Sequence, residues 1–282
     1  MNASLEDGTS EPSTTAAAPI LLDLRREAQA RQPDLSALPP LSEPERQMAI
    51  RTWRGRMVNE HISAQVWAGL VFSLMRAGAP PAALAELPAA IADELRHAEQ
   101  CAGVVHALGG VPVAPLPPLT PVPLHEEVSA VEGAVRNVIS VGCMSETIAV
   151  SIIRAEHAEL DDGPLATLLG EILADEVSHA RFGWRTLGVL MPRLDAAARA
   201  RTSRYLVDAF AHQVHHEVPR LPRSGIIRPE LGQAGVCDGG FARDLFLDTI
   251  QTVIVPGLTQ AGLNAQAAWA EAKAETAHVF NL

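Results

Sequence analysis

A seven-residue frame that occurs twice restricts the fold of this chain. The frame reads ADELRHA at 92–98 and ADEVSHA at 174–180, so both copies share Ala-Asp-Glu, one apolar residue, one variable residue and His-Ala. Because three residues of an α-helix advance by about 300°, the Glu and the His of each copy lie on one helix face. Charged groups at matching places on two otherwise apolar helices need a common partner, so the fold must bring these helices together.

Four long apolar segments predict the helices. Capping, proline and glycine signals place them at 42–76, 81–108, 125–159 and 164–191. Each copy of the frame falls on the second helix of a predicted hairpin. The proline-dense stretch 111–124 joins the hairpins, and at ~3.1 Å per residue it extends over roughly 40 Å, enough to cross a helix bundle. We therefore predict an all-α fold, a four-helix bundle of two hairpins and one long crossover.

The remaining residues form an arm before the bundle and an extension after it. Residues 1–41 are rich in Ser, Thr, Pro and Ala and are expected to be a mobile N-terminal arm. The bundle itself occupies 42–191. Residues 192–282 are expected to pack on the bundle, as a lid or as the interface of a homodimer. About two additional helices are predicted in this extension, at 194–218 and at 241–277, the second broken at Pro256–Gly257.

Composition limits the partners of the protein. A formal net charge of −11 and a pI near 5.4 disfavour nucleic acids and anionic membranes as partners. The chain has no uninterrupted apolar stretch of about 18 residues and no signal-peptide pattern, so we expect no membrane span. Its three cysteines lack the spacing of a metal or disulfide motif, which indicates a reducing compartment and predicts a cytoplasmic protein.

Hairpin symmetry predicts the groups that complete the site. In an antiparallel hairpin, residues equidistant from the turn lie at the same height, which places Glu60 near Glu94 and Glu146 near Glu176. Taken singly, each glutamate fits an exposed or salt-bridged helix residue. Burying all of them with two imidazoles would cost several kcal/mol per unpaired charge, whereas two divalent cations balance four carboxylates. The predicted metal ligands are Glu60, Glu94, His97, Glu146, Glu176 and His179.

The ligand types indicate which metals the site would take. Carboxylates and imidazoles favour iron or manganese over copper or zinc, and open coordination positions leave room for O2. We expect two Fe ions, with mixed Mn/Fe occupancy as the alternative. Asp93 is expected to accept a hydrogen bond from His179, and Asp175 from His97, which would fix the ring tautomers. The alternative for each aspartate is a solvated helix surface.

The order of these residues resembles the ferritin-like di-iron carboxylate superfamily over 42–191. The resemblance implies that Glu60, Glu94 and His97 hold one iron, that Glu146, Glu176 and His179 hold the other, and that Glu94 and Glu176 bridge them. It also implies an oxidoreductase, a monooxygenase-like enzyme that activates O2 to hydroxylate or N-oxygenate a small organic substrate. An external reductase would supply two electrons.

Departures from the family pattern reduce the number of reactions that the resemblance allows. The only tyrosine, Tyr205, falls in the extension, which disfavours a radical-storing reductase role. Ile172 stands where arylamine N-oxygenases add a histidine, and Val150 stands where hydroxylases often carry a threonine. The alternative function is ferritin- or rubrerythrin-like iron oxidation or peroxide detoxification without an organic substrate. A third hypothesis is a regulatory protein that keeps the metals without turnover.

Two further groups of residues have two interpretations each. Small and apolar residues beside the predicted metals indicate either a substrate pocket or close helix packing: Ala64, Trp67, Gly142, Cys143 and Val150. The sequence HQVHHE contains His212, His215 and His216. We interpret it as a partly exposed helix end, with a metal site or a cap on the pocket as the alternative.

Overall fold

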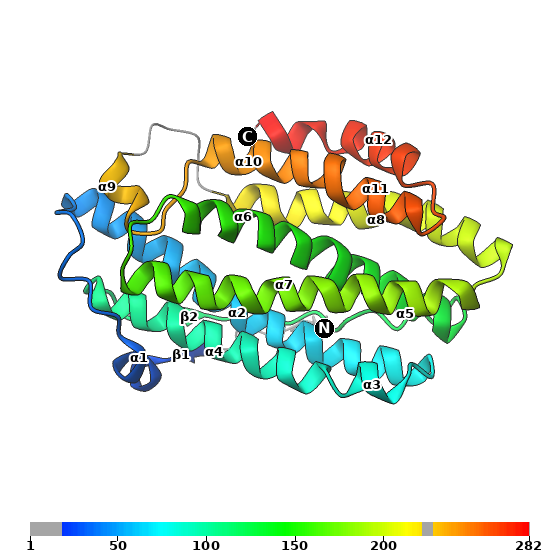
Figure 1. Ribbon diagram of the computed structural model, residues 1–282, viewed down its shortest axis with the longest axis horizontal. Coiled ribbons are helices and arrows are strands. Elements are labelled where there is room, and N and C mark those ends of the chain that lie inside the picture. Colours follow the sequence, from blue (N-terminus) through cyan, green and yellow to red (C-terminus); the bar gives the residue numbers. More distant parts are fainter. Residues whose placement is uncertain (1–18, 222–227, 282) are drawn as a thin grey trace, which may run out of the picture.

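Helices dominate the computed structural model of the protein, which describes residues 19–221 and 228–281 (Figure 1). The expected all-α fold is confirmed. The described residues contain one small antiparallel sheet, in which β1 (Leu21–Asp23) pairs with β2 (Val113–Pro115). β2 lies in the crossover between the two helical hairpins.

The first hairpin consists of α2 (Glu43–Arg76), the short α3 (Pro81–Leu84) and α4 (Leu87–Ala107). A capping box between Ser42 and Glu45 starts α2, and Gly78, with φ of 60°, turns the chain after it. The helix predicted from residue 81, with a bend expected near Pro88, is divided in the structure into α3 and α4, and α4 begins just before Pro88. A proline is tolerated in the first turn of a helix, where its missing N–H would have no partner.

The second hairpin consists of α5 (Ala130–Val138), a π-helical turn (Ile139–Ser145) and α6 (Glu146–Ala158), which return as α7 (Pro164–Leu190). The helix predicted from residue 125 begins later, because the Ser129 side chain accepts a hydrogen bond from the Glu132 amide and caps α5. The helix continues without interruption through the π-helical turn, from Ala130 to Ala158.

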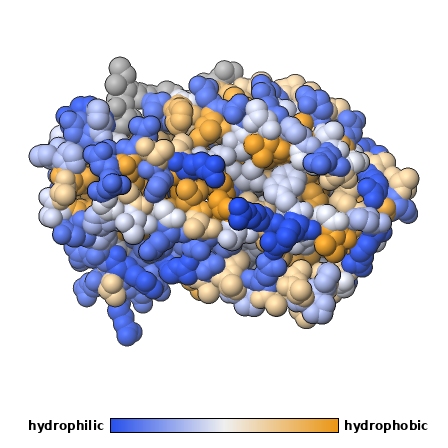
Figure 2. Space-filling view, in the orientation of Figure 1, coloured by the Kyte–Doolittle hydropathy of each residue, from blue (hydrophilic) through white to orange (hydrophobic). Residues whose placement is uncertain are grey.

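The run from Ala130 to Ala158 has the length and hydropathy of a membrane span, alone among the helices of the described ranges. Half of its most apolar window is buried inside the protein, and a single helix of this kind is weak evidence for a membrane span. Hydrophilic and hydrophobic residues are intermixed over the face shown in Figure 2.

The C-terminal extension contains more helices than predicted. They are α8 (Ala196–Glu217), α9 (Pro229–Gly232), α10 (Gly239–Thr249), α11 (Val255–Gln260) and α12 (Ala265–Glu275), with a second π-helical turn at Ile250–Ile254 and 3-10 turns at Met191–Arg193, Val218–Arg220 and Ala277–Asn281. α10 packs on α6 and α12 on α8 (Figure 1). The predicted break at Pro256–Gly257 is wrong, because Pro256 lies in the first turn of α11. The chain turns instead at Gly262, whose φ is 87°.

Part of the N-terminal arm packs against the bundle. Residues 1–18 of the arm lie outside the described residues. From residue 19 onward the chain forms β1 and then α1 (Arg25–Arg31), which packs on α4 and buries Ala28 completely. Gly103 of α4 permits this contact, since a Cβ there would lie 2.3 Å from the Arg31 carbonyl oxygen. α1 of the predicted arm thus lies against α4 of the bundle.

The apolar core divides into two clusters along the bundle. On three helices the change from one cluster to the other spans a short polar interval, between Met57 and Trp67 on α2, Ala90 and Cys101 on α4, and Ile172 and Phe182 on α7. The predicted metal ligands of these helices fall inside these intervals. The core therefore encloses a central polar layer between two apolar ends.

Candidate metal centre

Six acidic and imidazole side chains converge in this central layer. They are Glu60 from α2, Glu94 and His97 from α4, Glu146 from the first residue of α6, and Glu176 and His179 from α7. Their ligand atoms form two groups, each with all atoms within 4.8 Å of one another. One group is Glu60, Glu94, His97 and Glu176, and the other is Glu94, Glu146, Glu176 and His179. The structure thus brings together all six residues that the sequence predicts.

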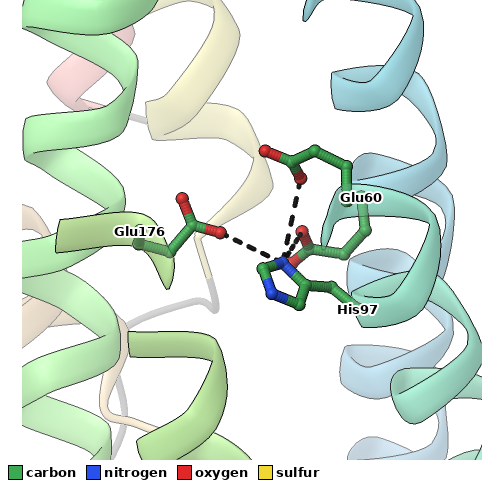
Figure 3. A group of neighbouring side chains, drawn as sticks. Glu60, His97 and Glu176 are labelled. Carbon is green, nitrogen blue, oxygen red and sulfur yellow. Dashed lines mark ion pairs between the residues drawn. The ribbon is translucent and has the colours of Figure 1, made fainter. Parts of the chain in front are cut away.

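The first group is arranged around His97. Its Nδ1 lies 3.3 Å from Glu176 Oε1, 3.6 Å from Glu60 Oε2 and 4.0 Å from Glu94 Oε2 (Figure 3). The His97 side chain is fully buried, and its Nδ1 makes no hydrogen bond within the described part of the chain. A buried nitrogen that lacks a hydrogen bond and faces three carboxylates has the chemistry expected of a metal ligand.

The second group is arranged around His179 in the same way. Its Nδ1 lies 3.3 Å from Glu94 Oε1, 3.3 Å from Glu176 Oε2 and 3.8 Å from Glu146 Oε2. Glu176 therefore turns one oxygen toward each histidine, and Glu94 does the same. The two ring centroids are 6.3 Å apart. This disposition suits two cations held side by side, with Glu94 and Glu176 shared between them.

The far nitrogens of both rings contact aspartates of the opposite frame. His97 Nε2 lies 3.1 Å from Asp175 Oδ2, and His179 Nε2 lies 3.4 Å from Asp93 Oδ2. A proton held on Nε2 by an aspartate leaves Nδ1, which faces the glutamates, free to bind a cation.

Arg96 joins the two halves, and the sequence pattern does not predict it. Its Nη1 donates to Asp93 Oδ1 at 2.7 Å, and its Nη2 donates to Asp175 Oδ2 at 2.6 Å. Arg96 occupies the variable place of the first frame, where the second frame has Ser178. Its spacing of three residues from Asp93 is the one available signal, because such pairs are neighbours on a helix.

The predicted pocket residues have different surroundings. Trp67 is buried, and its Nε1 donates to Glu94 Oε1 at 3.0 Å while its ring lies 5.2 Å from that of His179. Ala64 and Cys143 are buried, and Val150 is half-buried. Trp67 is therefore a direct neighbour of the candidate metal ligands.

Gly142 serves close packing instead of leaving open space. A Cβ on Gly142 would lie 2.5 Å from the Gly183 Cα, so the backbones of the π-helical turn and α7 are in contact there. Of the two interpretations of this residue, the structure supports helix packing. This contact lies one turn before Glu146 and one turn after His179, so it helps to fix the distance between these ligands.

The π-helical turn that precedes Glu146 is held by the C-terminal extension. The Glu146 amide donates to the Val141 carbonyl, five residues back, which is the π-helical pattern. Gln213 of α8 is buried, and its Nε2 donates to the Ser140 carbonyl at 3.1 Å and to Ser145 Oγ at 3.0 Å. Gln213 therefore ties α8 to the turn that positions a candidate metal ligand.

Gln213→Met is expected to weaken the Glu146–His179 half of the centre by about 10-fold to 100-fold in metal affinity, as loss of a residue that orients a ligand typically does. Methionine fills a similar volume but cannot donate to Ser140. Titration of the two sites with Mn²⁺, followed by electron paramagnetic resonance, would measure each affinity. The exposed Gln266→Met on α12 serves as the control. An equal loss at both sites would contradict a role specific to Glu146.

Burial and the neighbouring charges shift the pKa values of the histidines and glutamates in the centre. Burial opposes the charge on both imidazoles, but Glu176 and Glu60 raise the pKa of His97 to about 11, and Glu176 and Glu94 raise the pKa of His179 to about 10. Burial and neighbouring carboxylates raise the pKa values of Glu94 and Glu146 well above the usual range. Burial also acts to raise the pKa of Glu176, but its interactions with His179, His97 and Glu146 outweigh the effect of burial and lower that pKa.

Metal loading is therefore expected to release protons. Carboxylate neighbours raise the pKa of His97 to about 11 and that of His179 to about 10, so both rings are protonated at neutral pH, and a cation bound at each Nδ1 would displace that proton. The raised pKa values of Glu94 and Glu146 act in the same direction. Protons compete with the metal, so the affinity is expected to rise with pH until the free imidazoles lose these protons, at about pH 10 to pH 11. Calorimetric titration in buffers of different ionisation enthalpy would count the protons. Loading without proton release would contradict this account.

Comparisons of the chain with protein-family models, with curated proteins and with solved structures each find no match. What the centre can bind is inferred from its residues. Four carboxylates and two imidazoles, nearly all buried and enclosed by two apolar cores, can hold metal ions.

Proposed function

We propose that the protein is a non-haem di-iron oxidase or oxygenase that uses O2 to oxidise a small organic substrate. The observation that carries the proposal is the sharing of Glu94 and Glu176 between the two groups of ligand atoms. Carboxylates shared in this way are typical of a bundle that holds two cations close together. The arrangement supports the resemblance of the ligand order to the ferritin-like di-iron carboxylate proteins.

The donor set fits a pair of iron ions, or one manganese and one iron. Each half offers oxygen ligands and one imidazole nitrogen, a combination that suits these ions better than copper or zinc, which favour thiolates. The His97 Nδ1 that lacks a hydrogen bond fits the same assignment. When bound, two ferrous ions would supply the electrons and the coordination positions for O2.

The chain's own residues would hold and orient the reacting groups. Glu60 and Glu146 each belong to one half, so each would hold one cation, while His97 and His179 would donate from Nδ1. Asp93 and Asp175 would keep protons on the far nitrogens, and Arg96 would hold both aspartates in place through its hydrogen bonds. The apolar clusters on both sides would exclude water from the centre.

An external electron donor and a small-molecule substrate are the partners that this proposal requires. We also infer a cytoplasmic location, which the three unpaired cysteines support: Cys101, Cys143 and Cys237. The acidic net charge supports a protein that binds neither nucleic acid nor a membrane surface.

One observation favours the alternative, ferritin- or rubrerythrin-like oxidation of iron or reduction of peroxide. The backbone of Gly183 fills the space beside Gly142, and Trp67 lies directly against Glu94. This close packing would admit a small reactant such as peroxide more readily than an organic substrate.

Anaerobic loading with Fe²⁺ and exposure to O2 would test the proposal. An oxygenase is expected to bind two iron ions per chain and, with a reductant, to incorporate labelled oxygen from O2 into an organic product. A panel of small aromatic and amine substrates is a suitable start. Iron uptake far above two ions per chain would instead support storage, and peroxide consumption without an organic substrate would support detoxification. A chain that binds no metal would rule out all three functions.

A further inference from the structure

A second group of imidazoles lies at the C-terminal end of α8, apart from the candidate metal centre. His212 and His216 are one helical turn apart, and their rings are stacked, with centroids 5.8 Å apart and planes inclined by 26°. His212 is exposed and His216 is partly exposed, so solutes can reach both rings. The intervening His215 is on another face, where its ring lies 5.7 Å from that of His278.

A carboxylate orients one of the stacked rings. His216 Nδ1 lies 2.9 Å from Glu217 Oε1. A neutral imidazole donates to a carboxylate through Nδ1–H, and this leaves the lone pair on Nε2. Histidines that bind metals usually have such a partner on the nitrogen that does not face the ion. His216 is thus held in the tautomer that a metal ligand needs.

His212 is suited to the same role. Partial burial, followed by the charge of His216, lowers the pKa of His212, which favours the neutral form of its ring. Glu217 opposes this shift, whereas Arg220 adds to it. The Arg220 guanidinium is itself hydrogen-bonded to the His216 carbonyl oxygen.

We propose that His212 and His216 form a second metal site, at the surface, which takes one borderline divalent ion of the Ni²⁺, Cu²⁺ or Zn²⁺ type. Two histidines four residues apart on a helix can bind one ion from the same side, and Glu217 supplies the orienting carboxylate. Two nitrogen ligands select these ions against Mg²⁺ and Ca²⁺, which need oxygen ligands. The remaining coordination positions are left to water. The site does not depend on the function proposed for the buried centre.

Calorimetric titration of the whole chain with Ni²⁺ tests this site. Wild-type protein and three single variants are compared, His212→Ala, His216→Ala and the matched control His215→Ala. The buried centre is intact in all four proteins, so its contribution is common to them and cancels. All three substitutions lie on a solvent-facing helix end and are expected to leave the fold intact.

Beside any Ni²⁺ bound by the buried centre, the expected result is one surface Ni²⁺ per chain. Its affinity falls about tenfold or more in His212→Ala and in His216→Ala, and stays unchanged in His215→Ala. Glu217→Gln is expected to weaken the same binding by about tenfold, because it removes the orienting carboxylate. Equal Ni²⁺ binding by all variants would overturn the proposal. A loss in His215→Ala as large as in the other two would also overturn it, since the histidine pair would then not be the site.

Discussion

Replacement of Glu94 by alanine is expected to prevent the buried centre from holding the two metal ions proposed for it. Glu94 belongs to both groups of ligand atoms, with Oε2 on the side of His97 and Oε1 on the side of His179. Loss of a shared carboxylate leaves two cations close together without the charge that separates them. Metal content of the purified and reloaded variant, measured by mass spectrometry, should fall from two ions per chain to nearly none.

Two substitutions provide the comparison for Glu94→Ala. Glu60→Ala removes a carboxylate of one group only, so one ion should remain. Glu99→Ala, also on α4, removes a partly exposed carboxylate that pairs with Arg31 at the surface, and it should leave both ions in place. If Glu94→Ala kept the same metal content as Glu99→Ala, the shared role of Glu94 would be wrong.

The long-range pairing of the site residues was predictable because of helix geometry. Two antiparallel helices rise equally from their turn, so Glu60 could be matched with Glu94, and Glu146 with Glu176, without any knowledge of packing. Spacing alone does not place each aspartate beside the histidine of the other frame, so this pairing was an expectation, and the structure agrees with it at distances of 3.1 and 3.4 Å.

The π-helical turn, the hydrogen bonds of Gln213 and the contact of α1 with α4 could not be predicted from the pattern of apolar residues. A π-helical turn adds one residue to a turn of helix, and the run from Ile139 to Ser145 remains apolar enough to fit an ordinary helix. Gln213 lies 68 residues beyond Ser145, its hydrogen-bond partner, so only the folded chain shows that they meet. α1 packs closely on α4 at Gly103, a tertiary contact that the local sequence does not reveal.

The contact between Gly142 and Gly183 is the feature on which the geometry of the second half of the centre most depends. A Cβ added to Gly183 would lie 2.3 Å from the Gly142 carbonyl carbon and 2.5 Å from its Cα. Both are backbone atoms, which cannot rotate away as a side chain would. Alanine at this position must therefore push α7 away from the π-helical turn, and Glu146 moves away from His179 with it.

Gly183→Ala is expected to destabilise the metal-free protein by about 1–3 kcal/mol, the usual cost of overpacking, although alanine favours the helix itself. Gly188→Ala is the matched control on α7, because no atom lies within 4 Å of its added Cβ. That variant should gain about 0.5–1 kcal/mol from helix propensity. Urea unfolding of both metal-free variants would give the two free energies. If Gly183→Ala proved as stable as Gly188→Ala, α7 could move apart from the turn freely, and the close contact would not be what fixes Glu146 against His179.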